Sequence, residues 1–237
     1  EITKHVSLRQ TNPLALLQLR ETGKCEFALP EVLFDMDFPG HYKRRIESVA
    51  VSIPCVAGPY TSVNCTARLL ENKFRINAIA SDKNDYPEKI DATDERFITM
   101  NVPITAIAVS SGQNDSGLFE LNFRDERYMP FEGAGVISKW RLELPSSIRQ
   151  FDYDTITDVI MHIRYTSVDG GDKLKLPADA TVQDFVKSVE ELSQQEGLFA
   201  AFDLKHDFPN EWYRAIETPP AGTERILSLE DLNERLP

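Results

Sequence analysis

The sequence lacks the marks of several large protein classes. No apolar run approaches the ~20 residues of a membrane-spanning helix, and 11 Gly and 14 Pro among 237 residues exclude collagen-like and low-complexity chains. Basic residues are few, since 26 Lys and Arg against 38 Asp and Glu leave a net charge of −12. Nucleic acids and anionic membranes bind clustered Lys and Arg, so we expect no nucleic-acid partner and no direct membrane contact.

Cysteine is also scarce, and its spacing excludes common metal sites. The three cysteines, Cys25, Cys55 and Cys65, form no C-x-x-C pair, so no zinc site is expected. Cys55 and Cys65 are spaced to meet across a hairpin. The odd count and the missing secretory signal nevertheless favour buried, reduced thiols.

Catalytic signatures are missing as well. The sequence has no nucleophile elbow, no phosphate-binding loop, no dinucleotide-binding glycine motif and no H-E-x-x-H zinc motif. The histidines are scattered, and His162, next to Arg164 in a strand pattern, is expected to be structural. The acidic segment 82–95 does not match the spacing of an EF-hand, so we expect a solvated loop. No catalytic residue, metal or cofactor is predicted.

Alternating patterns are abundant and predict strands. In 44–53, Val49, Val51 and Ile53 alternate with small or polar residues, Ile46 is expected on the opposite face, and Pro54 ends the strand. Within 155–166 the predicted inward face consists of Val159, Met161, Ile163 and Tyr165. Shorter strands are predicted at 62–70, 74–80, 104–110, 118–123 and 140–144.

Helices are fewer. Asn12 before Pro13 is a typical helix start, and the helix is expected to run to about Arg20, ahead of Gly23. A second helix is predicted from Asp179 to Gly197, and a third at 209–216. The chain is therefore predicted to be mainly β: a single antiparallel β-sandwich-like domain over 1–237 with a few short peripheral helices. We expect it to be excised from a larger parent.

The segment 110–135 is the densest in recognisable features. A turn-forming cluster precedes an alternating strand, and Arg124, Asp125 and Glu126 then begin a run in which two arginines flank two acids, a pattern suited to a structural arginine–carboxylate lattice. The pair Gly133-x-Gly135 permits a tight backbone path.

Six blocks of the sequence together carry a family resemblance. They are residues 34–46 (FDMDFPGHYKRRI), 52–66 (SIPCVAGPYTSVNCT), 110–135 (SSGQNDSGLFELNFRDERYMPFEGAG), 151–171 (FDYDTITDVIMHIRYTSVDGG), 197–213 (GLFAAFDLKHDFPNEWY) and 229–237 (LEDLNERLP). In these blocks the chain resembles the C-terminal TcB-binding domain of the A components of Tc toxin complexes. Segments 72–100 and 216–228 match less well, as expected of variable loops.

The resemblance implies a function for the chain. The A component of this family, TcA, is a homopentamer that binds host cells and forms a translocation channel. Its C-terminal domain docks the B subunit, TcB, whose β-propeller gates the cocoon that TcB forms with TcC. By resemblance we expect a secreted toxin, a non-enzymatic docking domain, no cofactor and a TcB-type partner.

Interface residues are predicted from composition rather than from the resemblance. Interfaces are enriched in aromatic residues, Met and Arg. The loop after the strand at 118–123 offers such a run, and the predicted partner contacts are Arg127, Tyr128, Met129 and Phe131.

Two other functions remain open at this point. A carbohydrate-binding sandwich would use exposed aromatic rings, with Tyr60, Tyr86, Tyr128 and Trp212 as candidates. A hydrolase with a carboxylate pair has Glu126 and Glu132 as nominal candidates.

Overall fold

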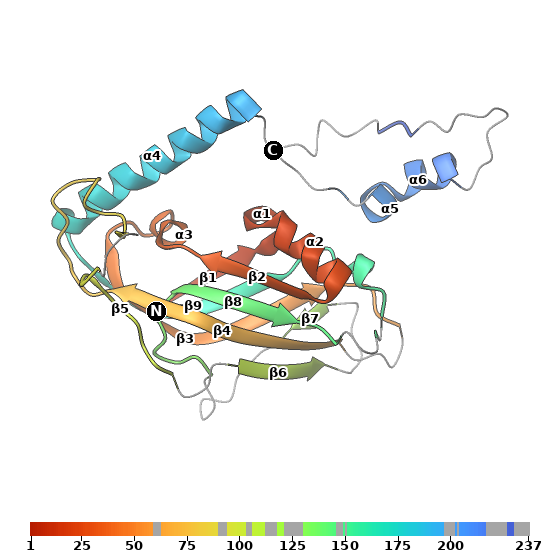
Figure 1. The fold of residues 1–237 in the computed structure, drawn as a ribbon, viewed down its shortest axis with the longest axis horizontal. Helices are drawn as coiled ribbons and strands as arrows, with labels where there is room; N and C mark the ends of the chain where they lie inside the picture. The colour runs from red at the N-terminus through yellow and green to blue at the C-terminus, as the bar shows by residue number, and fades with distance from the viewer. Residues whose placement is uncertain are drawn as a thin grey trace. The chain divides into compact units, whose positions relative to one another are not determined.

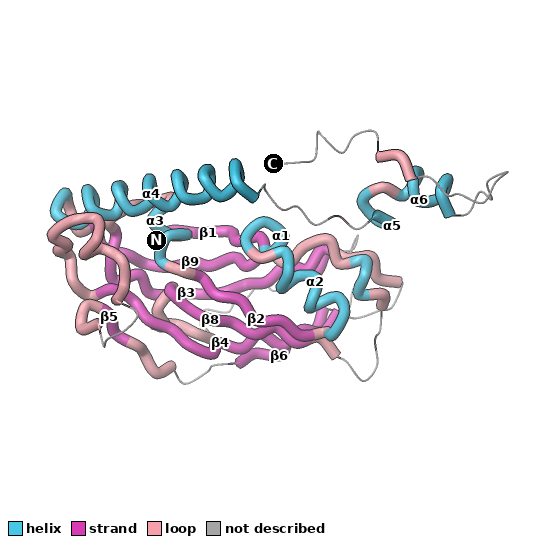
Figure 2. The backbone as a smooth tube through the Cα atoms, turned by 45° about the horizontal axis from the view of Figure 1, so that its top comes forward, coloured by secondary structure: helices cyan, strands magenta, loops and turns pink. Residues whose placement is uncertain are grey.

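The structure is a computed structural model that divides into two compact units, Glu1–Val189 and Glu190–Pro237. It describes residues 1–58, 63–89, 94–102, 106–111, 118–120, 130–145, 149, 151–196, 202, 204–216 and 227–229. The first unit contains two β-sheets and several helices (Figures 1 and 2).

The first sheet has four strands in the order β1-β9-β3-β7. Its neighbours run antiparallel, and the strands are β1 (Ile2–Ser7), β9 (Ile160–Asp169), β3 (His41–Pro54) and β7 (Leu118–Glu120). The two longest sequence-predicted strands are the neighbours β3 and β9. The predicted inward face of β9 is confirmed, because Val159 and the three alternating residues after it are buried.

The second sheet has the order β2-β8-β4-β5, and β6 also pairs with β4. Its strands are again antiparallel: β2 (Lys24–Leu29), β8 (Ile137–Glu143), β4 (Val63–Arg75), β5 (Phe97–Ile98) and β6 (Ala106–Ser111). The strand predicted at 74–80 is wrong beyond Arg75, because β4 is continuous from Val63 and ends there.

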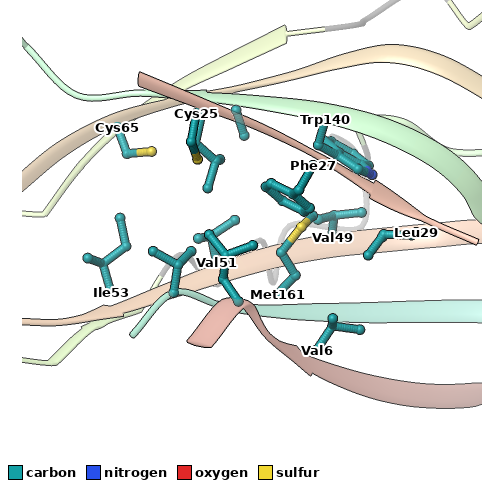
Figure 3. Packing of buried hydrophobic residues seen from close by; sticks show 14 of the residues in the cluster. Val6, Cys25, Phe27, Leu29, Val49, Val51, Ile53, Cys65, Trp140 and Met161 are labelled. Carbon is teal, nitrogen blue, oxygen red and sulfur yellow. The ribbon is translucent and has the colours of Figure 1, made fainter. Parts of the chain in front are cut away.

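The hydrophobic core lies between the two sheets (Figure 3). Phe27 and Trp140 from β2 and β8 face Val49, Val51 and Met161 from β3 and β9, and all five are buried. Apolar side chains that alternate along each strand thus form one shared interior, the arrangement of a β-sandwich. The predicted fold class, mainly β and sandwich-like, is confirmed.

One predicted strand face is wrong in detail. Ile46 was expected on the face opposite Val49, yet both are buried in the same core. The register of β3 on β9 shifts between Ile46 and Ser48. A bulge adds one residue to a strand, so it reverses the alternation and lets two residues of opposite parity point to the same side.

The helix α2 (Pro13–Thr22) forms as its sequence predicts. The Asn12 side chain accepts a hydrogen bond from the Ala15 amide at 3.1 Å, and Gly23 ends the helix in the left-handed conformation at φ 75°. A four-residue helix, α1 (Leu8–Thr11), precedes it, and α2 packs on β2. Two other short elements, α3 (Glu31–Asp35) and η1 (Tyr153–Thr155), connect strands.

The helix α4 (Asp172–Glu196) is the exception to the short helices expected, with 25 residues. It begins one to two turns before the predicted Asp179 and continues through Pro177. A proline inside a helix leaves the carbonyl four residues earlier without its amide. Here the Lys173 carbonyl accepts from the Ala80 amide instead, at 3.4 Å. Leu174 and Ala178 are fully buried against Ala80 and Tyr86.

The second unit contains two short helices, α5 (Leu204–Asp207) and α6 (Pro209–Ile216). The predicted helix at 209–216 is confirmed as α6. Within this unit the Phe202 and Phe208 rings meet edge to face at 5.8 Å. The single domain predicted over 1–237 stays a prediction.

All three cysteines are free and buried, as expected of reduced thiols. Burial raises the pKa of Cys25 to about 12 and that of Cys65 to about 12. Burial also raises the pKa of Cys55.

Alkaline solution should destabilise the chain through the thiols of Cys25 and Cys65. An unfolded thiol ionises near pH 9, whereas these two keep their protons to about 12, so the free energy of unfolding falls as pH rises between those values. Each thiol contributes about 1.4 kcal/mol per pH unit there. Urea titrations at pH 8 and pH 10 measure the fall. In the double variant Cys25→Ala, Cys65→Ala, the free energy of unfolding should fall less between the two pH values. The control Val51→Ala, a core truncation without a thiol, should show the same fall as the unaltered chain. Equal falls in the double variant and the unaltered chain would contradict the role of the two thiols.

Candidate functional site

The predicted contact loop is only partly within the described residues. Arg127, Tyr128 and Met129 lie outside them, as do the lattice residues Arg124, Asp125 and Glu126. Phe131 is described, and it is buried with 1% exposure. Its ring meets the Trp140 ring edge to face at 4.8 Å between centroids. The expectation that the Phe131 side chain lies at the surface is therefore wrong, because the ring fills the core between the sheets.

The segment after Phe131 is fixed to both sheets. On one side, the Gly133 amide donates to the Ile46 carbonyl at 2.8 Å and the Ile46 amide donates to the Ala134 carbonyl at 2.7 Å. On the other side, a Cβ added to Gly135 would lie 2.0 Å from the Lys73 carbonyl oxygen. The glycine pair noted in the sequence thus allows a close backbone approach at Gly135, and the base of the predicted loop is rigid.

A groove is formed in large part by residues of the second sheet. It has a volume of about 1120 Å³. Parts of β2, β8 and β4 line it together with α3, residues 86–88, described residues between 94 and 102, and Thr181 of α4. The lining is mixed, with apolar residues such as Leu70 and Ile137 beside charged residues such as Glu71 and Lys139.

A buried ion network holds one end of this groove. Arg75, 1% exposed, donates from Nε and Nη2 to the Glu31 carboxylate at 2.9 and 2.7 Å. Its guanidinium lies between the rings of Tyr86 and Phe97, 4.3 and 4.6 Å from their centroids. It also donates to the Tyr86 carbonyl at 2.6 Å. One arginine therefore joins β4, α3 and the 86–97 segment.

Asp35 and Arg44 extend the network into the interior. Arg44 donates to Asp35 Oδ1 at 2.6 Å, and the Tyr86 hydroxyl donates to Asp35 Oδ2 at 2.8 Å. Burial raises the pKa of Asp35 to about 6 in spite of these partners. Arg44 Nε and Nη1 and Arg75 Nη1 are buried without a hydrogen-bond acceptor. The network therefore lies in a strongly desolvated environment.

In the described part of the acidic segment 82–95, Asp82 is exposed, as expected of a solvated loop, whereas the Asp94 side chain is only 4% exposed. Arg96 binds Asp94 through Nε at 2.8 Å and Nη2 at 2.5 Å, which lowers the pKa of Asp94. Asp82 accepts from the amides of Asn84 and Asp85 at 2.8 and 3.0 Å. Acids of this segment thus close turns and pair with arginine. Among the described residues no three His, Cys, Asp or Glu side chains are grouped to hold a metal ion.

Other candidates from the sequence are placed as follows. His162 lies opposite His5 on β1, with 2.6 Å between their Nδ1 atoms, and its Nε2 is 2.7 Å from Ser52 Oγ, in agreement with a structural role. Tyr86 is 2% exposed, so it cannot offer a ring to a sugar. Tyr60 and Tyr128 lie outside the described residues, and Trp212 is partly buried. Of the carboxylate pair, Glu132 is exposed and Glu126 is not described.

No described helix is long and apolar enough to cross a membrane.

Comparison with known proteins decides the family. Residues 1–167 match the family model described as the Tc toxin complex TcA C-terminal TcB-binding domain. The chain belongs to this family. The matched range contains both sheets except the last two residues of β9. The family match therefore covers the sandwich, whereas α4, the second unit and the sequence blocks at 197–213 and 229–237 lie beyond it.

A curated relative agrees with the family. Toxin subunit YenA2 of Yersinia entomophaga is 37% identical over 175 residues, which are 72% of this chain and 13% of YenA2. The chain thus spans about an eighth of that relative. A solved structure, the cryo-EM structure of Yersinia pseudotuberculosis TcaA–TcaB, is 24% identical, covers 70% of this chain and 10% of that one, and superposes with a TM-score of 0.44.

Sequence reasoning missed the groove and its ion network. Glu31 and Arg75 are 44 positions apart, and no spacing rule relates them. One feature of the sequence could have indicated the network. Arg75 follows apolar Phe74 in a strand pattern, and charged residues are seldom buried in such positions.

Proposed function

We propose that this chain is a non-enzymatic docking domain that binds the TcB subunit of a TcB–TcC cocoon. The observation that carries the proposal is the family match over residues 1–167, which are the residues that build the sandwich. A rigid sandwich with a preformed groove suits docking, because a preorganised surface loses little conformational entropy on binding.

The rest of the toxin activity belongs to the parent protein in this proposal. Because the chain corresponds to 13% of YenA2, most of a related subunit lies elsewhere. We propose that the parent is a secreted homopentamer that forms a translocation channel, and that 1–237 is one docking module. Docking would bring the β-propeller of TcB to the channel entrance and couple cocoon opening to translocation.

The predicted contact loop has a defined place in this proposal. Its base at Phe131 is anchored in the core, so Arg127, Tyr128 and Met129 would extend from a fixed point. Arg124, Asp125 and Glu126 would pin the loop through arginine–carboxylate pairs. These six residues stay predictions, and Tyr128→Ala is the variant that addresses them.

A competition experiment tests the proposed docking. Full-length TcA is immobilised, and capture of the cognate TcB–TcC cocoon is measured while free chain is added. A pentamer gains avidity over a single module, so an excess on the order of 10² to 10⁴ of free chain should be needed to reduce capture. Serum albumin at equal mass is the control. Undiminished capture at the highest excess would contradict the proposal.

A further inference from the structure

The groove at the second sheet is lined by apolar residues between charged ones. Ala28 on β2 is exposed, and Leu70 and Ile137 are partly buried; these three residues are called the floor. Met100 and Val102 also line the groove, and residues 97–102 are called its wall. A floor of this kind binds apolar side chains by removing them from water.

The wall of the groove is held in place without any ligand. The Asn72 side-chain amide donates to the Met100 carbonyl at 2.8 Å, and its oxygen accepts from the Met100 amide at 3.4 Å. The same oxygen accepts from the Gly135 amide at 2.9 Å. At the other end of the wall, Phe97 packs on Arg75. Both ends of the 97–100 segment are thus fixed, and the groove is preformed.

The charges that line the groove are mostly acidic. Five of the charged lining residues are acids and two are lysines: Glu31, Asp35, Glu71, Glu88 and Asp94 against Lys73 and Lys139. Four of the acids form an ion pair with a neighbouring Lys or Arg, and each of the two lysines forms an ion pair with a neighbouring acid. Glu71 is the exception among these described side chains, because it is exposed and has no ion pair. One carboxylate beside the apolar floor therefore remains available to a cation.

We infer that this groove receives an extended segment of TcB in which an apolar side chain is followed by a Lys or Arg. The apolar side chain covers the floor at Ala28 and Ile137, and the cation pairs with Glu71. This inference rests on the proposed function, since it names the part of the partner that is bound.

Size and charge favour this occupant over two others. The groove volume of about 1120 Å³ exceeds the ~300–1,000 Å³ of typical small-molecule pockets. A second copy of this chain carries the same net charge of −12, and like charges oppose association. A basic segment of a different protein is attracted by the same field.

Two variants of the full chain test the groove, each with a matched control. Glu71→Lys reverses the free carboxylate, and Ala28→Arg fills the floor. The controls, Glu21→Lys and Leu14→Arg, make the same kinds of change at exposed positions of α2 outside the groove. Binding to purified TcB–TcC is measured by biolayer interferometry, and thermal melting confirms that all four variants are folded.

The expected result is an increase in Kd of about tenfold or more for both groove variants, with the controls within about twofold of the unaltered chain. If the unaltered chain binds and the groove variants bind equally well, the inference is overturned and the proposed function stands. If the unaltered chain does not bind, both the inference and the proposed function are overturned.

The occupant is identified by cross-linking. A photoreactive benzoylphenylalanine at Asn101, an exposed residue of the groove wall, is illuminated in the complex, and the linked peptide is sequenced by mass spectrometry. A TcB peptide with an apolar residue next to Lys or Arg is expected. Linkage to a second copy of this chain, or to a TcB peptide without a basic residue, would overturn the inference.

Discussion

Arg75→Ala is expected to lower the free energy of unfolding by about 3–5 kcal/mol, because it removes one partner of a buried ion pair and leaves Glu31 with only the longer contact to Arg44 Nη1 at 3.8 Å. Glu31 would lose two hydrogen bonds, and the Tyr86 and Phe97 rings would lose the guanidinium packed between them. Urea unfolding at pH 7.5, followed by circular dichroism, measures the loss.

Arg141→Ala is the matched control for Arg75→Ala. Arg141 also lies on a strand of the second sheet and also binds a glutamate through two nitrogens, Glu26 at 2.8 and 2.5 Å. That pair is more than a third exposed, so water screens it and the loss should be much smaller. If the two variants lost the same free energy of unfolding, burial would not be the reason for the contribution of Arg75 to stability.

Phe131→Ala is expected to cost about 3–5 kcal/mol of stability, the range for truncating a large buried aromatic residue. The variant would leave a cavity beside Trp140, in the middle of the core that joins the two sheets. Thermal and urea unfolding measure the change.

Tyr128→Ala is the comparison for Phe131→Ala. It is predicted to weaken TcB binding with no change in melting temperature, because Tyr128 is a predicted contact rather than a core residue. A Phe131→Ala variant that keeps its stability and loses only binding would contradict the placement of Phe131 in the core.

The strands that sequence predicts best are those with strict alternation. β9 and the part of β3 from Val49 to Ile53 each bury alternate apolar residues, so their inward faces were predicted correctly. β2 has the same alternation in Cys25, Phe27 and Leu29 and was missed although its signal is present. β1 is harder to predict, because Lys4 takes an inward position and pairs with Asp37 at 2.5 Å.

The errors arise where tertiary contacts override local pattern. Glu71 and Asn72 lie between the strands predicted at 62–70 and 74–80, yet β4 continues through them. A register shift after Leu69 and the hydrogen bonds of Asn72 accommodate these two residues in the strand. The helix α4 passes Pro177, since Ala80 satisfies the carbonyl that the proline leaves open. Neither compensation can be read from neighbouring residues.

The candidate site was less predictable than the fold. The family resemblance pointed to docking, and the family match confirms the family. The groove, however, is assembled from β2, β4, β8, α3 and the 86–102 segment, and no motif joins these parts of the sequence. Sequence reasoning placed Asp94 in solvent with the rest of the 82–95 segment and did not predict its ion pair with Arg96.

The most direct test of the central claim is the equilibrium affinity of this chain for the cognate TcB–TcC cocoon. Sedimentation velocity with labelled chain at physiological salt measures it without immobilisation. The account predicts saturable binding with one chain per docking position on TcB and weaker binding as salt rises, because acidic groups of the chain attract a basic surface. No complex at concentrations well above those at which full-length TcA captures the cocoon would contradict the account.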